Sequence, residues 1–312
     1  MKILGIGNAI VDVLCKVEDN FLEKNSLTKS TMKLIDEIEF KNLLSNLNIQ
    51  ETISGGSVAN SIVGLSQLGN DVGFVGKVKD DELGNKYENG LVNENVKYFY
   101  SKKYEPISTG SCLILVTPDS ERTMCTFLGT AGKISDNDID GKIIKNSDIT
   151  FLEGYLWDEG EPRKAFEKAI NNSNKVAMTL SDIFCVERHK EEFLNLVKNK
   201  LDIIFANEKE ILSLIDGKSI DEAISFSKNL NKNIIITRGA EGAIAINKQE
   251  VAEHSAKKNL DIVDLTGAGD LFAAGYLHGV INNLSLKECL GHGTELSSKI
   301  IQKFGARLVK NK

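Results

Sequence analysis

Short apolar runs recur along this chain of 312 residues, and amphipathic segments fill the intervals between them. Uninterrupted runs of this length are typical of strands that are buried on both faces of a sheet. The runs are KILGIG, GFVGKV, DITFLEG, KVAMTL, LDIIFAN and NIIITRG. The amphipathic segments cover 57–69, 81–93, 161–171, 187–199 and 219–230. Strand and helix that alternate in this way predict an α/β fold, with a mostly parallel central sheet and helices on both faces.

Two parts of the sequence break the alternation. They have the pattern of strands, but no helix long enough for a parallel return stands between them. These strands span 11–17 with 32–35, and 107–117 with 122–128. We therefore expect a small antiparallel β-sheet outside the main one, formed from about 11–50 and 97–130, in a position to act as a lid.

The C-terminal third of the chain ends in helical segments over 268–281 and 286–303, separated by a turn at Asn282 and Asn283. No repeat, low-complexity tract or flexible linker interrupts the sequence. The length suffices for one substantial core. We therefore expect a single α/β domain over residues 1–312 that carries the lid.

The bulk composition narrows the classes of partner. A net charge of -6, with Lys, Asp and Glu intermixed, leaves no basic face and argues against nucleic acid and membrane surfaces as partners. The five cysteines stand far apart without a CxxC pair, so we expect buried thiols rather than disulfides or a zinc site. The N-terminal apolar run is broken by Asn8 and Asp12 and has the pattern of a strand rather than of a signal. Together these features predict a cytoplasmic protein.

The stretch DLTGAGDLFAAG, residues 264–275, places glycines at the start of an apolar helix. The backbone N–H groups of Gly267, Ala268 and Gly269 carry little side-chain bulk, so they can approach an anion at the positive end of the helix. Asp270 in the first turn would lie beside that anion, where a carboxylate can take a proton from an attacking hydroxyl. Complementing the helix dipole is the alternative role for Asp270.

DLTGAGD is similar to the second signature of the ribokinase-like (PfkB) kinases, and ISGGSVANSIVGLSQLG, residues 53–69, resembles their first. GNAIVD, GKVKDDELG, FLEGYLWD, MTLSD and FANEKE also stand in the expected order. The resemblance extends over nearly the whole chain and points to the adenosine kinase branch in bacteria. It implies a ribokinase-like fold with a β lid, ATP as the phosphoryl donor and Mg²⁺ as its accompanying ion.

The resemblance implies an acceptor site in the first half of the chain. Asp12 matches the acid that holds sugar hydroxyls, and Asn8 stands four residues before it in the same site. Gly55 and Gly56 match the glycines against which the acceptor lies, and Asn60 matches the residue that binds a ribose hydroxyl. On the residues alone, Asp12 could instead cap a turn, and the glycines could belong to an ordinary strand-to-helix turn with the next residue, a serine, as the cap.

Flat and apolar side chains favour a purine over a bare sugar in this site. Met124, Tyr155, Leu156 and Trp157 offer such a surface, although large apolar side chains more often belong to the core. Arg122, on the expected lid, matches an arginine that reaches the transferred phosphate when the lid closes. A solvated arginine in a turn is the alternative for Arg122.

The second half of the chain contains the residues that the resemblance assigns to ATP and its metal ion. Asn207 and Glu210 match an N-x-x-E element near the phosphates, with Glu210 on the Mg²⁺ side; an Asn cap before a charged helical turn is the alternative. The other positions assigned to the nucleotide are Thr237, Arg238, Gly239, Gly242, Thr266 and His292. A surface hairpin over 233–246 would explain the loop residues equally well. His189 and His254 lack partner spacing and are expected in solvent.

The leading hypothesis is an ATP-dependent kinase that phosphorylates the 5′-hydroxyl of a nucleoside, adenosine above all. A kinase of a free sugar such as ribose or fructose is the alternative within the family. A dinucleotide-dependent dehydrogenase is a weaker alternative, because GIGNAI has Ile10 where that motif ends in glycine. A nucleoside-binding protein without catalysis, a requirement for K⁺ and a homodimer through the lid edges all stay open.

Overall fold

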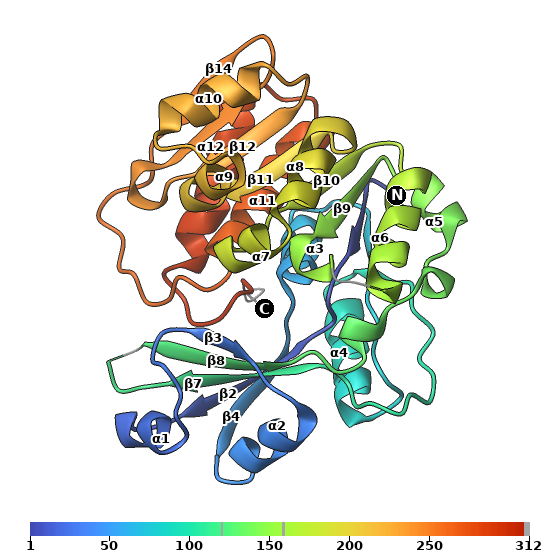
Figure 1. Ribbon diagram of the computed structural model, residues 1–312, viewed down its shortest axis with the longest axis vertical. Coiled ribbons are helices and arrows are strands. Elements are labelled where there is room, and N and C mark those ends of the chain that lie inside the picture. Colours follow the sequence, from blue (N-terminus) through green and yellow to red (C-terminus); the bar gives the residue numbers. More distant parts are fainter. Residues whose placement is uncertain (120, 158–159, 309–312) are drawn as a thin grey trace.

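The computed structural model describes residues 1–119, 121–157 and 160–308. They form a large α/β body and a smaller sheet beside it, which occupies the lower part of Figure 1. Ser120 of the segment DSERTM and Asp158 of FLEGYLWD lie outside the described residues.

Within the described residues, the body contains a nine-stranded sheet in the order β14-β13-β12-β11-β10-β9-β1-β5-β6. The strands are β1 Ile3–Ile6, β5 Val72–Val75, β6 Lys97–Tyr98, β9 Ile149–Glu153, β10 Val176–Thr179, β11 Ile203–Asn207, β12 Asn233–Thr237, β13 Ala243–Ile246 and β14 Val251–His254. Neighbours from β6 to β12 pair in parallel, and β12, β13 and β14 pair antiparallel. The mostly parallel sheet expected from the apolar runs is confirmed.

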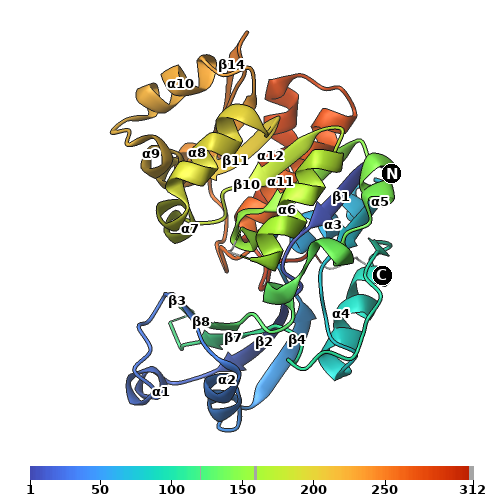
Figure 2. The ribbon, with the colours of Figure 1, turned by 45° about the vertical axis from the view of Figure 1, so that its right-hand side comes forward.

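Successive side chains of a strand point to opposite faces, so each face of this sheet is buried under its own layer of helices. Ile3 and Phe205 belong to one core, and their neighbours Leu4 and Ile204 belong to the other. The first layer contains α3 Ser57–Gln67, α4 Glu82–Val92, α11 Ala268–Ile281 and α12 Leu286–Ile300. The second contains α5 Gly141–Lys145, α6 Glu161–Asn172, α7 Ile183–Arg188, α8 Lys190–Asn199, α9 Glu208–Ile215 and α10 Ile220–Lys228. Figure 2 shows the sheet between α6 and α8 on one side and α11 and α12 on the other.

The smaller sheet, which we call the lid sheet, has five strands among the described residues, in the order β3-β8-β7-β2-β4. They are β2 Val11–Lys16, β3 Met32–Leu34, β4 Ile49–Ser54, β7 Ser111–Val116 and β8 Arg122–Phe127. Two short helices, α1 Asp19–Lys24 and α2 Glu37–Leu44, cover the side that faces away from the body (Figure 1). The other side of the lid sheet therefore faces the body.

The expectation of an antiparallel lid is wrong, because the lid sheet is mixed. β2 pairs in parallel with β7 and β3 pairs in parallel with β8, whereas the pairs β2–β4 and β7–β8 are antiparallel. A parallel pair needs a long connection, and between β4 and β7 the chain supplies it by passing through α3, β5, α4 and β6 of the body. β4 has no counterpart among the expected strands, because its sequence IQETIS is polar and most of the strand is exposed or half-buried at an edge.

The chain passes between the body and the lid sheet next to glycines. Gly7 follows β1, and Gly55 with Gly56 follows β4. Gly110 precedes β7 and Gly129 follows β8. Gly56 and Gly129 have φ angles of 93° and 51°, in the region that favours glycine. The connections between body and lid sheet therefore contain residues of high backbone freedom.

Several local expectations need correction or receive support. The segment 187–199 does not form one helix, because α7 ends at Arg188 and α8 begins at Lys190. All five cysteines are free and buried, as expected. In the part of the chain that the structure describes, no helix is both long and apolar enough to cross a bilayer. The same residues contain no group of three His, Cys, Asp or Glu side chains that could hold a metal ion.

Candidate active site

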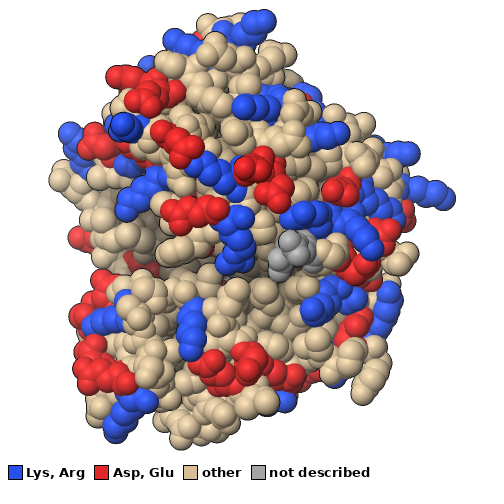
Figure 3. All heavy atoms as spheres, in the orientation of Figure 1, with Lys and Arg blue, Asp and Glu red and all other residues tan. Residues whose placement is uncertain are grey.

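Two cavities lie at the carboxyl ends of the body strands, where ligands bind in open parallel sheets. The sheet cavity, of about 290 Å³, lies among the ends of β9 to β12, α9, α3 and the start of α11. The lid cavity, of about 430 Å³, lies between the lid sheet and the body, and Figure 3 shows the surface hollowed between these two parts. Ser57, the first residue of α3, lines both cavities. The two spaces therefore meet at the N-terminus of α3.

The N-terminus of α11 borders the sheet cavity. Gly267 is the N-cap with a φ of 76°, and a Cβ there would lie only 2.7 Å from the Cα of Ala306. Gly269 lines the cavity, and a Cβ on it would meet nothing within 4 Å. The backbone thus requires glycine at 267, whereas the absence of a side chain at 269 leaves space that the protein itself does not fill. Helix-terminal N–H groups beside such space are suited to bind an anion.

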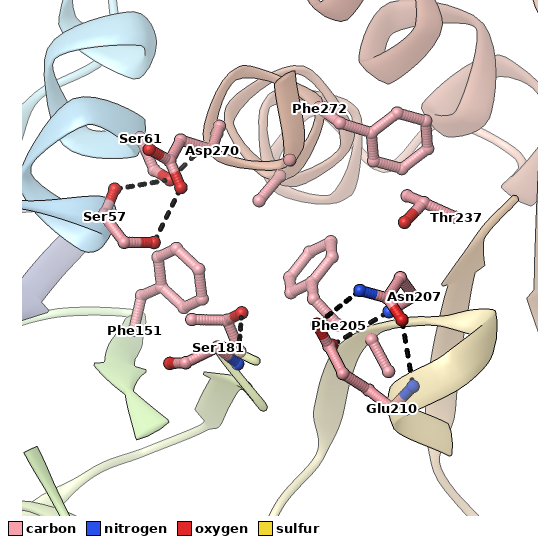
Figure 4. A pocket seen from close by; sticks show the side chains of 14 residues that line it. Ser57, Ser61, Phe151, Ser181, Phe205, Asn207, Glu210, Thr237, Asp270 and Phe272 are labelled. Atoms are coloured by element: carbon pink, nitrogen blue, oxygen red, sulfur yellow. Dashed lines mark hydrogen bonds between the residues drawn. The ribbon is translucent and has the colours of Figure 1, made fainter. Parts of the chain in front are cut away.

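Asp270 lies in the first turn of α11, and its side chain points toward Ser57 (Figure 4). Its carboxylate accepts hydrogen bonds from Ser57 Oγ at 2.6 Å and from Asn60 Nδ2 at 3.0 Å. Burial raises the pKa of Asp270 to about 6, and these hydrogen bonds and the charge of Arg307 oppose that rise. A half-buried carboxylate with a pKa close to neutrality is suited to accept a proton.

Asp12, on β2, lines the lid cavity. Its burial raises its pKa to about 7; Arg307 and Arg122 lower it, while Asp270 raises it. A Cβ at Gly55 would overlap the Asp12 carboxyl group, so glycine at this position makes room for the acid. The sequence thus brings Asp12 and Asp270 within electrostatic reach of each other from opposite ends of the chain.

Gly56 is the N-cap of α3, with a φ of 93°, and a Cβ there would overlap the backbone carbonyl of Asn8. Ser57 does not cap the helix, contrary to the ordinary-turn interpretation of this motif, because its hydroxyl donates to Asp270 instead. The turn therefore serves the site as well as the helix.

Glu153 is a site residue that the sequence interpretation missed. It ends β9, is 2% exposed and lines the lid cavity. Its carboxylate accepts from Asn8 Nδ2 at 3.1 Å and from the N–H of Val58 at 3.2 Å. Burial raises its pKa to about 7. Glu153 therefore fixes the Asn8 side chain and the N-terminus of α3. Its place at the end of a buried strand, in FLEG, is the sequence signal that could have revealed it.

Flat and apolar side chains line the lid cavity. Met124 comes from the lid sheet, and Tyr155 and Trp157 come from the segment after β9. Leu156 is not among the lining residues and belongs to the core. His189 was expected in solvent, but it is 7% exposed and lines the cavity, because the junction between α7 and α8 packs against this part of the body.

Asn207 and Glu210 line the sheet cavity and form a capping box at the start of α9 (Figure 4). The Asn207 side chain accepts from the N–H of Glu210 at 2.9 Å, and Glu210 accepts from the N–H of Asn207 at 2.9 Å. Burial raises the pKa of Glu210 to about 7. Asn207 therefore caps α9, as the alternative interpretation expected, and both Asn207 and Glu210 also line the cavity. Thr237, at the end of β12, lines it too.

The remaining nucleotide positions do not line the sheet cavity. Arg238 pairs with Glu208 at 3.2 Å, and its N–H closes the turn on the carbonyl of Gly242 at 2.8 Å. Gly239 begins the short helix inside that turn, so the hairpin alternative describes this segment as well. His292 is exposed on α12, with its ring 5.3 Å from that of His278.

Arg122 reaches from the lid sheet to the loop before α11. Its guanidinium pairs with Asp264 at 2.5 Å and donates to Thr266 Oγ1 at 3.0 Å. The same group lies 4.3 Å from the ring centroid of Phe304. Arg122 is therefore packed beside the glycines of α11 and is not a solvated turn residue.

Arg307 is a second arginine in this region that the sequence interpretation missed. Its Nε donates to Asn60 Oδ1 at 3.0 Å. Its charge acts on both Asp12 and Asp270. The site thus contains the half-buried carboxylates of Asp12 and Asp270, the buried carboxylate of Glu153 and two arginines, around the junction of the cavities.

The glycines of GIGNAI serve packing. A Cβ at Gly5 would lie 2.5 Å from Ile62 of α3, and one at Gly7 would lie 2.5 Å from the Glu153 carboxylate. These contacts explain both glycines without a dinucleotide. The dehydrogenase interpretation therefore has no support at this strand.

Comparisons with known proteins agree with this architecture. The profile described as "pfkB family carbohydrate kinase" matches residues 29–312. The crystal structure of adenosine kinase from Sinorhizobium meliloti is similar with a TM-score of 0.92 and 34% identity, over 99% of this chain and 96% of that chain. The 5-dehydro-2-deoxygluconokinase of Geobacillus kaustophilus is 26% identical, over 79% of this chain and 78% of its own. Adenosine kinase 2 of Arabidopsis thaliana is 24% identical, over 97% of this chain and 94% of its own.

Proposed function

We propose that this chain, which belongs to the pfkB family of carbohydrate kinases, transfers the γ-phosphoryl group of ATP to the 5′-hydroxyl of adenosine. The family makes it an ATP-dependent kinase whose acceptor is an alcohol. One observation carries the proposal: Asp270, with a pKa raised to about 6, lies at the N-terminus of α11, lines the sheet cavity and accepts a hydrogen bond from Ser57, which lines both cavities. An acceptor in the lid cavity and a phosphate in the sheet cavity would both reach it.

Asp270 acts as the base in this mechanism. The 5′-hydroxyl gives its proton to the carboxylate while its oxygen bonds to the γ-phosphorus, and the bond between that phosphorus and the leaving ADP oxygen breaks. Ser57 and Asn60 hold the carboxylate in place through their hydrogen bonds at 2.6 and 3.0 Å. With a pKa of about 6, Asp270 is ionised at neutral pH and can accept the proton.

The charge that develops on the transferred group is met by the start of α11. The N–H groups of Gly267 and Gly269 would donate to its oxygens, because these residues begin the helix and Gly269 lines the cavity. The N–H of Ala268 donates to the carbonyl of Leu265 at 3.2 Å and would join them only by leaving that carbonyl. Arg122 adds a positive charge beside them through its bond to Thr266. Positioning and charge stabilisation of this kind provide most of the catalysis in phosphoryl transfer.

The sheet cavity would hold the phosphates of ATP and its Mg²⁺. Thr237, Asn207 and Glu210 line it and offer a hydroxyl, an amide and a carboxylate. Oxygen donors of this type suit Mg²⁺, which keeps several waters and contacts few protein groups. When bound, Mg²⁺ would neutralise charge on the phosphate oxygens. We also propose that Arg238, Gly239, Gly242 and His292 approach the nucleotide outside this cavity. A dependence on K⁺ is to be tested with the same assay.

The lid cavity favours a nucleoside over a free sugar. Its volume of about 430 Å³ lies within the range of pockets that enclose whole small-molecule ligands. Met124, Tyr155 and Trp157 line it and provide flat or apolar surface for a purine, while Asn8 and Asp12 provide polar groups for a ribose.

An acceptor screen tests the proposal. ADP formation is measured with ATP, Mg²⁺ and, in separate reactions, adenosine, inosine, ribose or fructose. We expect kcat/KM for adenosine to exceed that for either sugar by at least about tenfold, which corresponds to about 1.4 kcal/mol of transition-state binding. 5′-Deoxyadenosine, which lacks the acceptor hydroxyl, is the matched control and should inhibit without reacting. Faster turnover of a sugar would reject adenosine, and absence of turnover with every acceptor would favour a binding protein.

The cell compartment and pathway follow from the same proposal. All five cysteines are free and buried, which suits the reducing cytoplasm. We therefore place the enzyme there, where conversion of adenosine to AMP would serve purine salvage.

A further inference from the structure

The segment after α12 enters the active site. The N–H of Gly305 donates to Asp264 Oδ2 at 2.7 Å, beside the start of α11. Ala306 packs against Gly267 so closely that a Cβ on the glycine would lie 2.8 Å from the Cβ of Ala306. The carbonyl of Leu308 accepts a hydrogen bond of 2.8 Å from the last turn of α3. The C-terminal segment is therefore fixed between α3 and α11, the two helices that hold the proposed base.

These contacts place Arg307 in a chain of hydrogen bonds that ends at Asp270. Arg307 Nε donates to Asn60 Oδ1 at 3.0 Å, and Asn60 Nδ2 donates to Asp270 Oδ2 at 3.0 Å. An amide has one acceptor end and one donor end, so Arg307 determines which end of Asn60 faces the carboxylate. Without a donor at its oxygen, Asn60 could turn over and present a lone pair to Asp270.

Arg307 also lies near the half-buried acids Asp12 and Asp270. With Asp12 and Asn60 it lines a void of only about 10 Å³. Its Nη2 is buried and has no hydrogen-bond partner among the described residues. A buried guanidinium nitrogen left with an unused donor is unfavourable, so the position of Arg307 near two carboxylates indicates that its charge is needed there.

We propose that Arg307 is a positioning residue of the kinase site, which orients Asn60 toward the base and compensates the charges of Asp12 and Asp270. This inference rests on the proposed function, because it assigns Arg307 to the same reaction. It makes the C-terminal segment part of the active site, although Arg307 stands 37 residues after Asp270 in the sequence.

The electrostatic role of Arg307 has a measurable consequence. Arg307 lowers the pKa values of Asp12 and Asp270, whereas the charge of Asp270 raises the pKa of Asp12. Glu153 faces the same region from β9, and Asp270 raises its pKa too. Arg122 acts on Asp12 from β8. Loss of Arg307 would leave this group of acids with less positive charge, so Asp270 would become ionised only at a higher pH.

The test compares four proteins: wild type, Arg307→Met, Arg307→Gln and Lys303→Met. Lys303 is exposed on the same segment, so its variant is the control for the loss of one positive charge. For Arg307→Met we expect kcat/KM to fall by about 10- to 100-fold, because a charged hydrogen bond is lost. In a plot of kcat/KM against pH, we call the fall in rate toward low pH the acid limb. We expect this limb to move up by about one pH unit in Arg307→Met. Lys303→Met should match wild type in both measurements.

Arg307→Gln separates orientation from charge. Gln can donate to Asn60 but carries no charge, so the acid limb should move as in Arg307→Met while the rate at high pH recovers. Variants that are slow but keep the wild-type acid limb would overturn the electrostatic part of the inference. The Arg307→Gln measurement also decides the matter if Arg307→Met does not fold, which thermal unfolding would reveal.

A double variant tests the route through Asn60. If Arg307 acts by orienting Asn60, Arg307→Met in an Asn60→Ala background should cause less than about threefold further loss at a pH high enough to ionise Asp270 in both proteins, because the two residues work as a unit. Losses that multiply would contradict this route. Failure of the proposed function is distinguishable, because it would show as wild-type turnover of another acceptor, and the same variants would then be measured with that acceptor.

Discussion

Replacing Asp270 with Asn tests the proposed base most directly, because the substitution preserves the size and shape of the side chain. Ser57 and Asn60 donate to the carboxylate at 2.6 and 3.0 Å. The amide keeps one acceptor oxygen for Asn60, and the serine hydroxyl can rotate to accept from the new NH₂ group. The lost proton acceptance should lower kcat by about 10²- to 10⁴-fold, or about 3–5 kcal/mol of transition-state stabilisation. Adenosine binding should persist.

The same substitution should raise the stability of the fold at alkaline pH. Burial raises the pKa of Asp270 from 3.8 to about 6, so ionisation is less favourable in the folded protein than in the unfolded chain. Below pH 3.8 the group is neutral in both states and the difference vanishes. Above pH 6 it is ionised in both states, and a difference of about 3 kcal/mol opposes folding. Asp270→Asn should therefore unfold at a higher temperature than wild type at pH 8, and the two should converge toward pH 4.

The assay pairs ADP formation with thermal unfolding at several pH values, and calorimetry measures adenosine binding. Asp221→Asn is the matched control, because Asp221 is also an acid in the first turn of a helix but is exposed. It should keep full activity and change stability by less than about 1 kcal/mol. Asp270→Asn turnover within tenfold of wild type would refute the base role. A stability difference that does not depend on pH would contradict the raised pKa of Asp270 in the folded protein.

Two further substitutions address the anion site and the acceptor site. Gly269→Ala should fold normally, because a Cβ there meets nothing within 4 Å, but it should lower kcat/KM by about tenfold or more because the methyl group obstructs the phosphate. Gly267→Ala should lower the free energy of unfolding by about 1–3 kcal/mol because residue 267 has a φ of 76°. Equal unfolding midpoints for the two variants would contradict this distinction. Glu153→Gln turns one acceptor into a donor toward Asn8 or the N–H of Val58, so KM for the acceptor should rise by about five- to tenfold with a smaller change in kcat. An unchanged KM in steady-state kinetics would remove Glu153 from acceptor binding.

The body of the fold was predictable from the sequence because its signals are local. Buried parallel strands appear as continuous apolar runs, and each run found a place in the main sheet. The helix expected over 268–281 has those bounds in the structure, because the glycines before it and Asn282 after it mark both ends. The lid sheet was less predictable, because the partners of β2 and β3 lie far along the chain and a pattern of strands does not state which of them pair.

Some residues of the candidate site could be predicted from local motifs, and others could not. Asp12, Asn60 and Asp270 lie in recognisable motifs, and the structure brings them together. Arg307 is 247 residues from Asn60 in the sequence, and nothing near it marks it as more than a basic residue close to the C-terminus. Glu153 resembles any polar residue that ends a strand, until its hydrogen bonds to Asn8 and to the start of α3 are seen.

The glycine-marked connections between the body and the lid sheet limit how that sheet can move. The chain crosses between the body and the lid sheet near Gly7, Gly56, Gly110 and Gly129. The lid sheet is therefore joined to the body by four connections rather than by a single hinge. If the lid sheet moves as one body, Asp12 and Arg122 move together, because β2 and β8 both pair with β7. Binding of the acceptor by Asp12 and the approach of the positive charge of Arg122 would then occur in the same movement.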